Sequence, residues 1–195
     1  TIPSTFRTVW EVGAYRRARF CHKMMERYPG EFHHYHAFEP VPEYYQDLQS
    51  ERRNSAASSH HLTTHPFGLA ATNLTWTVSS IAMKGPATYL ANESISISAN
   101  NRRNKQEFLR KKHENMTIQF ASFDFAVQAA GGMPPFLLHL DCEGCEWDLI
   151  PQAHESGFLA QIPILQVSFH NYPIEHLGER IQQYCSIQKQ VYETH

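Results

Sequence analysis

The sequence predicts an α/β fold, a three-layer αβα sandwich in which helices cover both faces of a doubly wound, mostly parallel sheet. Segments typical of strands and of helices alternate along roughly the first fifty residues, as expected when right-handed crossovers connect parallel strands. A nearly continuous apolar run at residues 136–141 is typical of a central strand that is covered on both faces. A chain of 195 residues can bury one core, so we expect a single domain over 1–195.

The first two strand-helix units have clear boundaries. Residues 8–14 combine β-favouring residues with a glycine near the end, which predicts a buried strand followed by a tight turn. Residues 15–28 contain no helix breaker before Pro29-Gly30 and predict a helix. A second strand is expected at 33–38, and a proline opens the next helix at 42–48.

The remaining elements are predicted with less regular spacing, and residues 73–113 are treated as an insertion. In order, we expect a strand within 62–71, β-prone pieces at 75–81 and 94–98, a polar helix at 104–113, a strand at 116–120, a helix from 123 that ends at Gly131-Gly132, the central strand at 136–141, a helix at 147–156, a strand at 162–170, a helix at 174–184 and a last strand at 186–192.

Composition excludes several classes of protein. The formal charge of -2 gives no signal for binding polyanions, and the basic residues within 102–112 fit the solvated face of a helix better than a nucleic-acid site. No apolar run approaches the roughly 20 residues of a membrane-spanning helix. The chain does not begin with Met, so we expect a domain that is incomplete at one or both ends and whose targeting segments are absent.

Cysteines and sequons bear on the compartment and on metal binding. Three Asn-x-Ser/Thr sequons, at Asn73, Asn92 and Asn115, are compatible with the lumen of the secretory pathway, although a cytoplasmic location stays open. Cys142 and Cys145 form a C-x-x-C without a second pair, so we expect them to pack rather than to bind metal. His33, His34 and His36 lack a metal-ligand spacing, and no metal ligand is assigned.

Acids and glycines gather where the expected parallel strands end, which is where open α/β sheets bind ligands. These residues are Glu11, Gly13 and Ala14 after the first strand, Glu39 after the second, Asp141, Glu143 and Gly144 after the central strand, and Ser168 and His170 after the next. Glu39 suits the hydroxyls of a ribose, and a glycine turn before a helix suits a carboxylate. Glu39 could instead cap the following helix, and Glu146 could stabilise a helix N-terminus.

Four ordered segments together resemble the FkbM-like methyltransferase family. They are residues 11–14 (EVGA), 37–40 (AFEP), 123–125 (FDF) and 140–146 (LDCEGCE), and their order and spacing cover nearly the whole chain. The resemblance implies a Rossmann-like class I methyltransferase fold and methylation of an oxygen on a small-molecule, sugar or lipid acceptor. It implies S-adenosylmethionine as the cofactor, bound by Glu11, Gly13, Ala14, Glu39, Asp124 and Asp141. It also implies catalytic roles for Asp141, Glu143 and His170.

Departures from the family pattern keep two other hypotheses open. Arg17 stands where the family has the second glycine of the first turn, and Ser168 stands where Glu is usual. These two residues motivate the hypothesis of a degenerate domain that serves as a binding or scaffolding module. That hypothesis predicts that the Arg17 side chain fills the pocket above Gly13. A metal-dependent hydrolase built on the acidic cluster ranks third.

Overall fold

A five-stranded parallel sheet forms the centre of the domain in the computed structural model, which describes residues 7–54, 61–79, 115–170 and 177–195. Its strand order is β3-β2-β1-β7-β8, and every neighbouring pair is parallel. The strands are β1 (Thr8–Val12), β2 (His34–Phe38), β3 (Leu62–His65), β7 (Leu137–Leu140) and β8 (Ile164–Val167). The order reverses direction at β1, as in a doubly wound sheet, so the predicted α/β fold class is confirmed.

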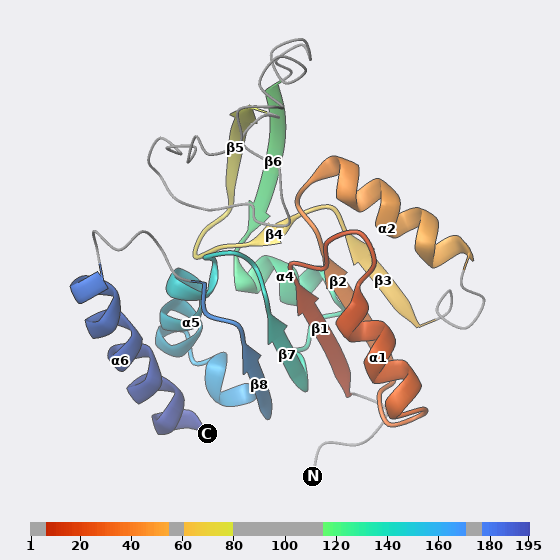
Figure 1. The fold of residues 1–195 in the computed structure, drawn as a ribbon. Coiled ribbons are helices and arrows are strands. Elements are labelled where there is room, and N and C mark those ends of the chain that lie inside the picture. The colour runs from red at the N-terminus through yellow and green to blue at the C-terminus, as the bar shows by residue number, and fades with distance from the viewer. Residues whose placement is uncertain (1–6, 55–60, 80–114, 171–176) are drawn as a thin grey trace.

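Helices cover both faces of this sheet and complete the three layers (Figure 1). The helices are α1 (Arg19–Arg27), α2 (Pro42–Asn54), α4 (Phe123–Ala129), α5 (Glu146–Glu155), the short 3-10 helix η3 (Leu159–Gln161) and α6 (Leu177–Thr194). Alternate residues of each strand point to opposite faces. Val9 belongs to the apolar cluster under α1 and α2, whereas its neighbour Trp10 belongs to the cluster under α4, α5 and α6.

A second, three-stranded sheet adjoins the first and extends away from the body of the domain (Figure 1). It contains β4 (Gly68–Leu69), β5 (Leu74–Ser79) and β6 (Asn115–Ala121) in the order β4-β6-β5. The strands β5 and β6 are antiparallel, so the β-prone pieces predicted near 75–81 and 116–120 do form strands and pair with each other. The strand expected at 94–98, the helix expected at 104–113 and the basic stretch lie outside the described residues.

The predicted strand at 186–192 is wrong, because α6 continues without interruption to Thr194. Ile187 and Val191 pack against the core cluster, whereas Lys189 between them is exposed. A spacing of four residues suits one face of a helix, and a strand would have placed all three side chains on the same face. The β-favouring residue types here were outweighed by this amphipathic packing.

Two further boundaries differ from the prediction for local reasons. The helix expected from residue 15 begins at Arg19, because Ala18 takes a left-handed conformation with φ 43° and residues 15–17 form a turn. The strand expected within 62–71 is divided into β3 and β4 around Pro66, which has no N–H to donate to a sheet.

Candidate functional site

A pocket lies at the carboxyl ends of β1, β2 and β7, and residues of the second sheet form its opposite wall. It encloses about 470 Å³, including space open to solvent. Its walls are Val12, Gly13, Tyr15, Glu39, Pro40, Tyr44, Gly68, Leu69, Phe120, Asp141, Cys142, Glu143 and Cys145. Four of the residues singled out in the sequence, Gly13, Glu39, Asp141 and Glu143, therefore face one space.

Gly13 makes the first turn possible by allowing two segments of backbone to touch. Its φ is +86°, and a Cβ atom at this position would lie 2.0 Å from the carbonyl oxygen of Asp141. The backbone N–H groups of Gly13 and Ala14 both donate to the carbonyl of Phe38, each at 3.1 Å. The turn is thus bonded to β2 and packed on the end of β7, and its first two N–H groups already have partners.

Glu39 is a buried carboxylate in the wall of the pocket, with 4% of its surface exposed. Its Oε2 accepts the backbone N–H of Tyr15 at 2.7 Å, and its Oε1 accepts that of Val41 at 2.9 Å. Burial raises the pKa of Glu39 to about 7, although the two backbone hydrogen bonds oppose the rise. The side chain therefore holds the entry to α2 and also lines the pocket.

Three other residues assigned to the cofactor from the resemblance do not line this pocket. Glu11 turns toward α1 and accepts the backbone N–H groups of Phe20 at 3.2 Å and Cys21 at 2.8 Å. Its burial raises its pKa to about 7, against these hydrogen bonds. Ala14 is packed in the core beneath α1, and Asp124 is exposed in the first turn of α4.

The three residues proposed as catalytic meet at one edge of the pocket. His170 Nε2 lies 3.2 Å from Asp141 Oδ1 and 3.5 Å from Glu143 Oε1. Glu143 lies in the acidic turn, residues 141–145 between β7 and α5, and has φ +56°, the left-handed conformation that glycine favours. Burial raises the pKa of Glu143 above its ordinary value, while the neighbouring His170 opposes the rise.

Glu146 is a fourth member of this group that sequence reasoning did not connect to His170. Its side chain is fully buried, and Oε1 accepts the backbone N–H of His170 at 2.7 Å. The same oxygen lies 3.1 Å from His170 Nδ1, and Oε2 accepts the backbone N–H of Gly144 at 3.0 Å. Twenty-four residues separate the partners, and no local pattern in the sequence reports such a contact.

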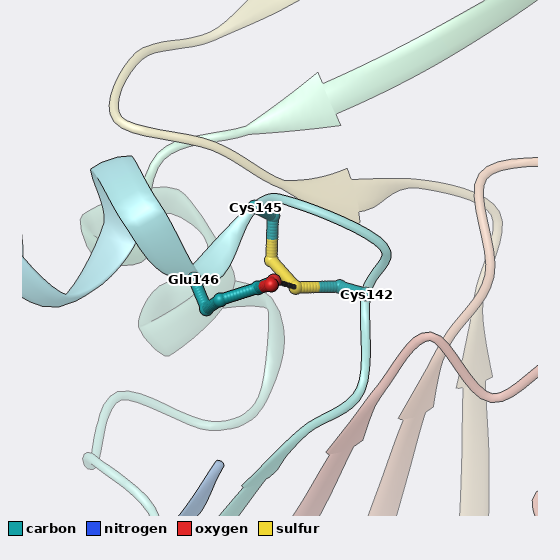
Figure 2. Close-up of side chains that lie close together, drawn as sticks. All are labelled: Cys142, Cys145 and Glu146. Carbon is teal, nitrogen blue, oxygen red and sulfur yellow. Dashed lines mark hydrogen bonds between the residues drawn. A yellow bond between two sulfur atoms is a disulfide. The ribbon is translucent and has the colours of Figure 1, made fainter. Parts of the chain in front are cut away.

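Cys142 and Cys145 form a disulfide across the acidic turn, where simple packing was expected (Figure 2). The carboxylate of Glu146 is directed at this bridge, with Oε2 3.3 Å from Cys142 Sγ. This is a contact rather than a hydrogen bond, because a disulfide sulfur carries no hydrogen. Among the described residues, these three side chains are also the group whose spacing would suit a metal ion, but the two sulfurs are bonded to each other.

Arg17 does not fill the pocket. Its side chain is exposed and is not part of the pocket wall. The left-handed conformations of this turn fall on Tyr15 and Ala18, so Arg17 itself needs no glycine-like backbone. The neighbouring Arg16 lies over the ring of Tyr44 at 4.5 Å.

Side chains that were not assigned to the site from the sequence also form its walls. The rings of Tyr15 and Tyr44 pack edge to face at 4.6 Å, and both line the pocket. Leu69 and Phe120 come from the second sheet, whose position over the strand ends is a tertiary feature.

Within the part of the chain that the structure describes, no helix is long and apolar enough to cross a membrane.

Comparison with known proteins gives a consistent result. The family model described as Methyltransferase FkbM domain matches residues 11–193. A similar solved structure is the crystal structure of Methyltransferase FkbM from Methylobacillus flagellatus KT, with a TM-score of 0.50 and 15% sequence identity. The similarity covers 84% of this chain but 33% of that one, so this chain spans about a third of its length. No curated protein is similar enough in sequence to count as a match. Because the family model spans most of the sequence, the chain belongs to the FkbM methyltransferase domain family.

Proposed function

We propose that the domain uses S-adenosylmethionine to methylate a hydroxyl oxygen of a small-molecule, sugar or lipid acceptor. Membership of a methyltransferase family supports the reaction class. The observation that carries the proposal is the placement of the buried Glu39 carboxylate beside Gly13 and Asp141 in one pocket at the strand ends. This is the region of an open α/β sheet in which ligands bind.

The residues of the pocket fit a nucleoside that carries a positive charge. Each oxygen of Glu39 accepts one backbone N–H and retains a lone pair, so the carboxylate can accept both hydroxyls of a ribose. Carboxylates at Asp141 and Glu143 favour a sulfonium cation at the same edge. The N–H groups of Gly13 and Ala14 donate to the carbonyl of Phe38, so we do not assign them to the carboxylate of the cofactor's methionine part.

His170 and Asp141 are suited to handle the proton of the acceptor. S-adenosylmethionine, when bound, supplies an electrophilic methyl group on a sulfonium sulfur. As the acceptor oxygen gains that methyl group it loses its proton, which His170 Nε2 accepts beside Asp141 and Glu143. The domain contributes mainly by placing the two reactants in line and by excluding water.

A second, more open groove suggests where the acceptor enters. Its volume is about 880 Å³, including space open to solvent, and its lining is largely apolar, with Phe67, Leu74, Phe120 and Phe125 among the residues. Phe120 lines both this groove and the pocket at the strand ends. This lining favours an acceptor with an apolar part next to its hydroxyl, such as a lipid or an aromatic glycoside, over a free sugar.

The two alternative functions receive less support. The binding-module hypothesis expected Arg17 to obstruct the pocket, and this side chain is exposed away from it. The hydrolase hypothesis needs several carboxylates that converge on one ion, whereas the described side chains close enough together to share an ion are Cys142, Cys145 and Glu146, and the two sulfurs are bonded to each other.

Methyl transfer can be tested directly with a donor that carries an isotope label on its methyl group. The label should appear in a hydroxylated lipid or aromatic glycoside and not with the E39Q variant. The Glu26→Gln variant, which removes an exposed carboxylate from α1, is the control and should transfer label normally. A wild-type protein that binds S-adenosylhomocysteine but labels no acceptor in any of the three classes would support the binding module instead.

A further inference from the structure

We propose that Glu146 is a positioning residue that fixes the ring of His170 so that Nε2, and not Nδ1, is the nitrogen that gains and loses a proton at the pocket. The inference deepens the proposed function, because it states which atom of His170 acts and what holds it. It rests on the hydrogen bonds that meet at a carboxylate with no exposed surface.

Two consecutive residues of α5 hold the backbone of His170. Glu146 Oε1 accepts the His170 N–H at 2.7 Å, and the indole Nε1–H of Trp147 donates to the His170 carbonyl at 3.0 Å. His170 lies three residues beyond the end of β8 at Val167. Anchors from α5 thus set where the imidazole is attached.

The imidazole ring of His170 is held by the same side chain. The Glu146 oxygen that accepts the backbone N–H also lies 3.1 Å from Nδ1. An ionised carboxylate only accepts hydrogen bonds, so Nδ1 must carry a hydrogen and donate it. The backbone N–H groups of Gly144 and His170 donate to Oε2 and Oε1, so both oxygens of Glu146 act as acceptors. Nε2 also faces carboxylates, but the side chain of Asp141 is about half exposed and can turn to solvent, and Glu143 Oε1 is 3.5 Å away, whereas the fully buried Glu146 keeps its contact with Nδ1. A neutral His170 is therefore the tautomer with its hydrogen on Nδ1.

The other ring nitrogen of His170, Nε2, lies beside Asp141 and Glu143. With Nδ1 committed to Glu146, the free lone pair of a neutral ring is on Nε2, which points to Asp141 and Glu143 in the pocket wall. When Nε2 takes a proton, the resulting imidazolium has carboxylate oxygens at 3.2 and 3.5 Å. Histidines that act in this way depend on a partner at the second nitrogen to set the tautomer.

The second oxygen of Glu146 also has partners. Its Oε2 is held between the Gly144 N–H and the Cys142–Cys145 disulfide, as Figure 2 shows for the carboxylate and the bridge. Glutamine has one oxygen in place of two. Whichever end that oxygen occupies, the amide NH₂ opposes an N–H donor at the other end. The E146Q variant should therefore disturb either Gly144 or His170 with little change in volume.

Long-range ¹⁵N–¹H correlation spectra of the whole chain, recorded near pH 8 where histidines are mostly neutral, test the inference. For the wild type we expect the His170 ring to show its hydrogen on Nδ1. In E146Q we expect a mixture of tautomers and faster hydrogen exchange of the His170 backbone amide. The matched control is D148N, which removes an exposed carboxylate from the first turn of the same helix and should leave both signals unchanged.

Each result decides the point. A wild-type ring with its hydrogen on Nε2 would overturn the inference, even if E146Q fails to fold. A folded E146Q with an unchanged tautomer would also overturn it. Calorimetric titration of the same samples with S-adenosylhomocysteine separates the two proposals. A wild type that does not bind this compound contradicts the proposed function, while the tautomer reports on Glu146 alone.

Discussion

The carbonyl oxygen of Asp141 lies so close to Gly13 that a Cβ atom added to this glycine would be only 2.0 Å from it. The turn after β1 and the turn after β7 are thus packed backbone to backbone. Both turns line the pocket, so their contact sets the position of Gly13 relative to the acidic residues.

The Gly13→Ala variant should be strongly destabilised. The left-handed φ of +86° costs a non-glycine residue about 1–2 kcal/mol, and the clash with Asp141 adds a further cost, for a total of about 3 kcal/mol. Gly30→Ala separates the two effects, because Gly30 has φ +82° but nothing within 4 Å of the added Cβ. Urea unfolding of both variants measures the difference, and equal losses would contradict the proposed close approach.

Two buried histidines should make a contribution to the stability of the domain that is lost on acidification. His36 Nδ1 lies 3.0 Å from His65 Nε2, and burial lowers the pKa of His36 to about 3 and of His65 to about 4. Between these values and the ordinary 6.5 the unfolded chain binds protons that the folded chain does not, so the free energy of unfolding falls as pH drops below about 6.5. The raised pKa values of Glu11 and Glu39 act in the opposite sense, with stability lost as pH rises from 4.5 to about 7.

A double variant isolates the histidine contribution from that of the acids. H36Q/H65Q retains side chains that can hydrogen-bond to each other but do not titrate. Its free energy of unfolding, measured by urea at a series of pH values between 4 and about 6.5, should fall more, or rise less, with increasing pH than that of the wild type, because the histidine contribution is removed and that of Glu11 and Glu39 remains. Identical slopes would show that the two histidines are not buried as neutral groups.

Reduction of the Cys142–Cys145 disulfide should lower the stability of the domain by about 2 kcal/mol, the loop-closure estimate for so short a loop. Thermal unfolding with and without a dithiol reductant measures the loss, and C142S/C145S should match the reduced protein. The exposed Cys185 supplies the control variant C185S, which should unfold like the wild type. Thiol counting on the unreduced, denatured chain should find two of its four cysteines free, and four free thiols would contradict the bridge.

Expression through a secretory host should place a glycan on Asn73. This residue is exposed ahead of β5 within an Asn-x-Thr sequon, and its Oδ1 accepts the backbone N–H of Ser122 at 2.7 Å. A glycan attaches to the amide nitrogen, so that hydrogen bond is preserved. A mass increase that a glycosidase removes and that N73Q lacks is the expected result. A folded, secreted protein without a glycan at Asn73 would contradict it.

Local patterns were sufficient for the central sheet and for part of the site. Apolar strands that end in acids or glycines are readable in the sequence, and parallel pairing brings those ends together, which is why Glu39 and Asp141 were found. The approach of Glu146 to His170 depends on how α5 packs beside β8, which periodicity does not encode. The same is true of Phe120, which reaches the pocket from the second sheet. The continuation of α6 to Thr194 was also missed, because β-favouring residue types near its end predicted a strand.

The measurement that tests the central claim most directly is a calorimetric titration of the domain with S-adenosylhomocysteine in the absence of added metal. We expect micromolar binding by the wild type and by E26Q. We expect binding at least about tenfold weaker in E39Q, because a buried carboxylate that accepts hydrogen bonds from the ligand is lost. A folded wild-type protein that binds nothing, or an E39Q variant with unchanged affinity, would contradict the assignment of this pocket to the methyl donor.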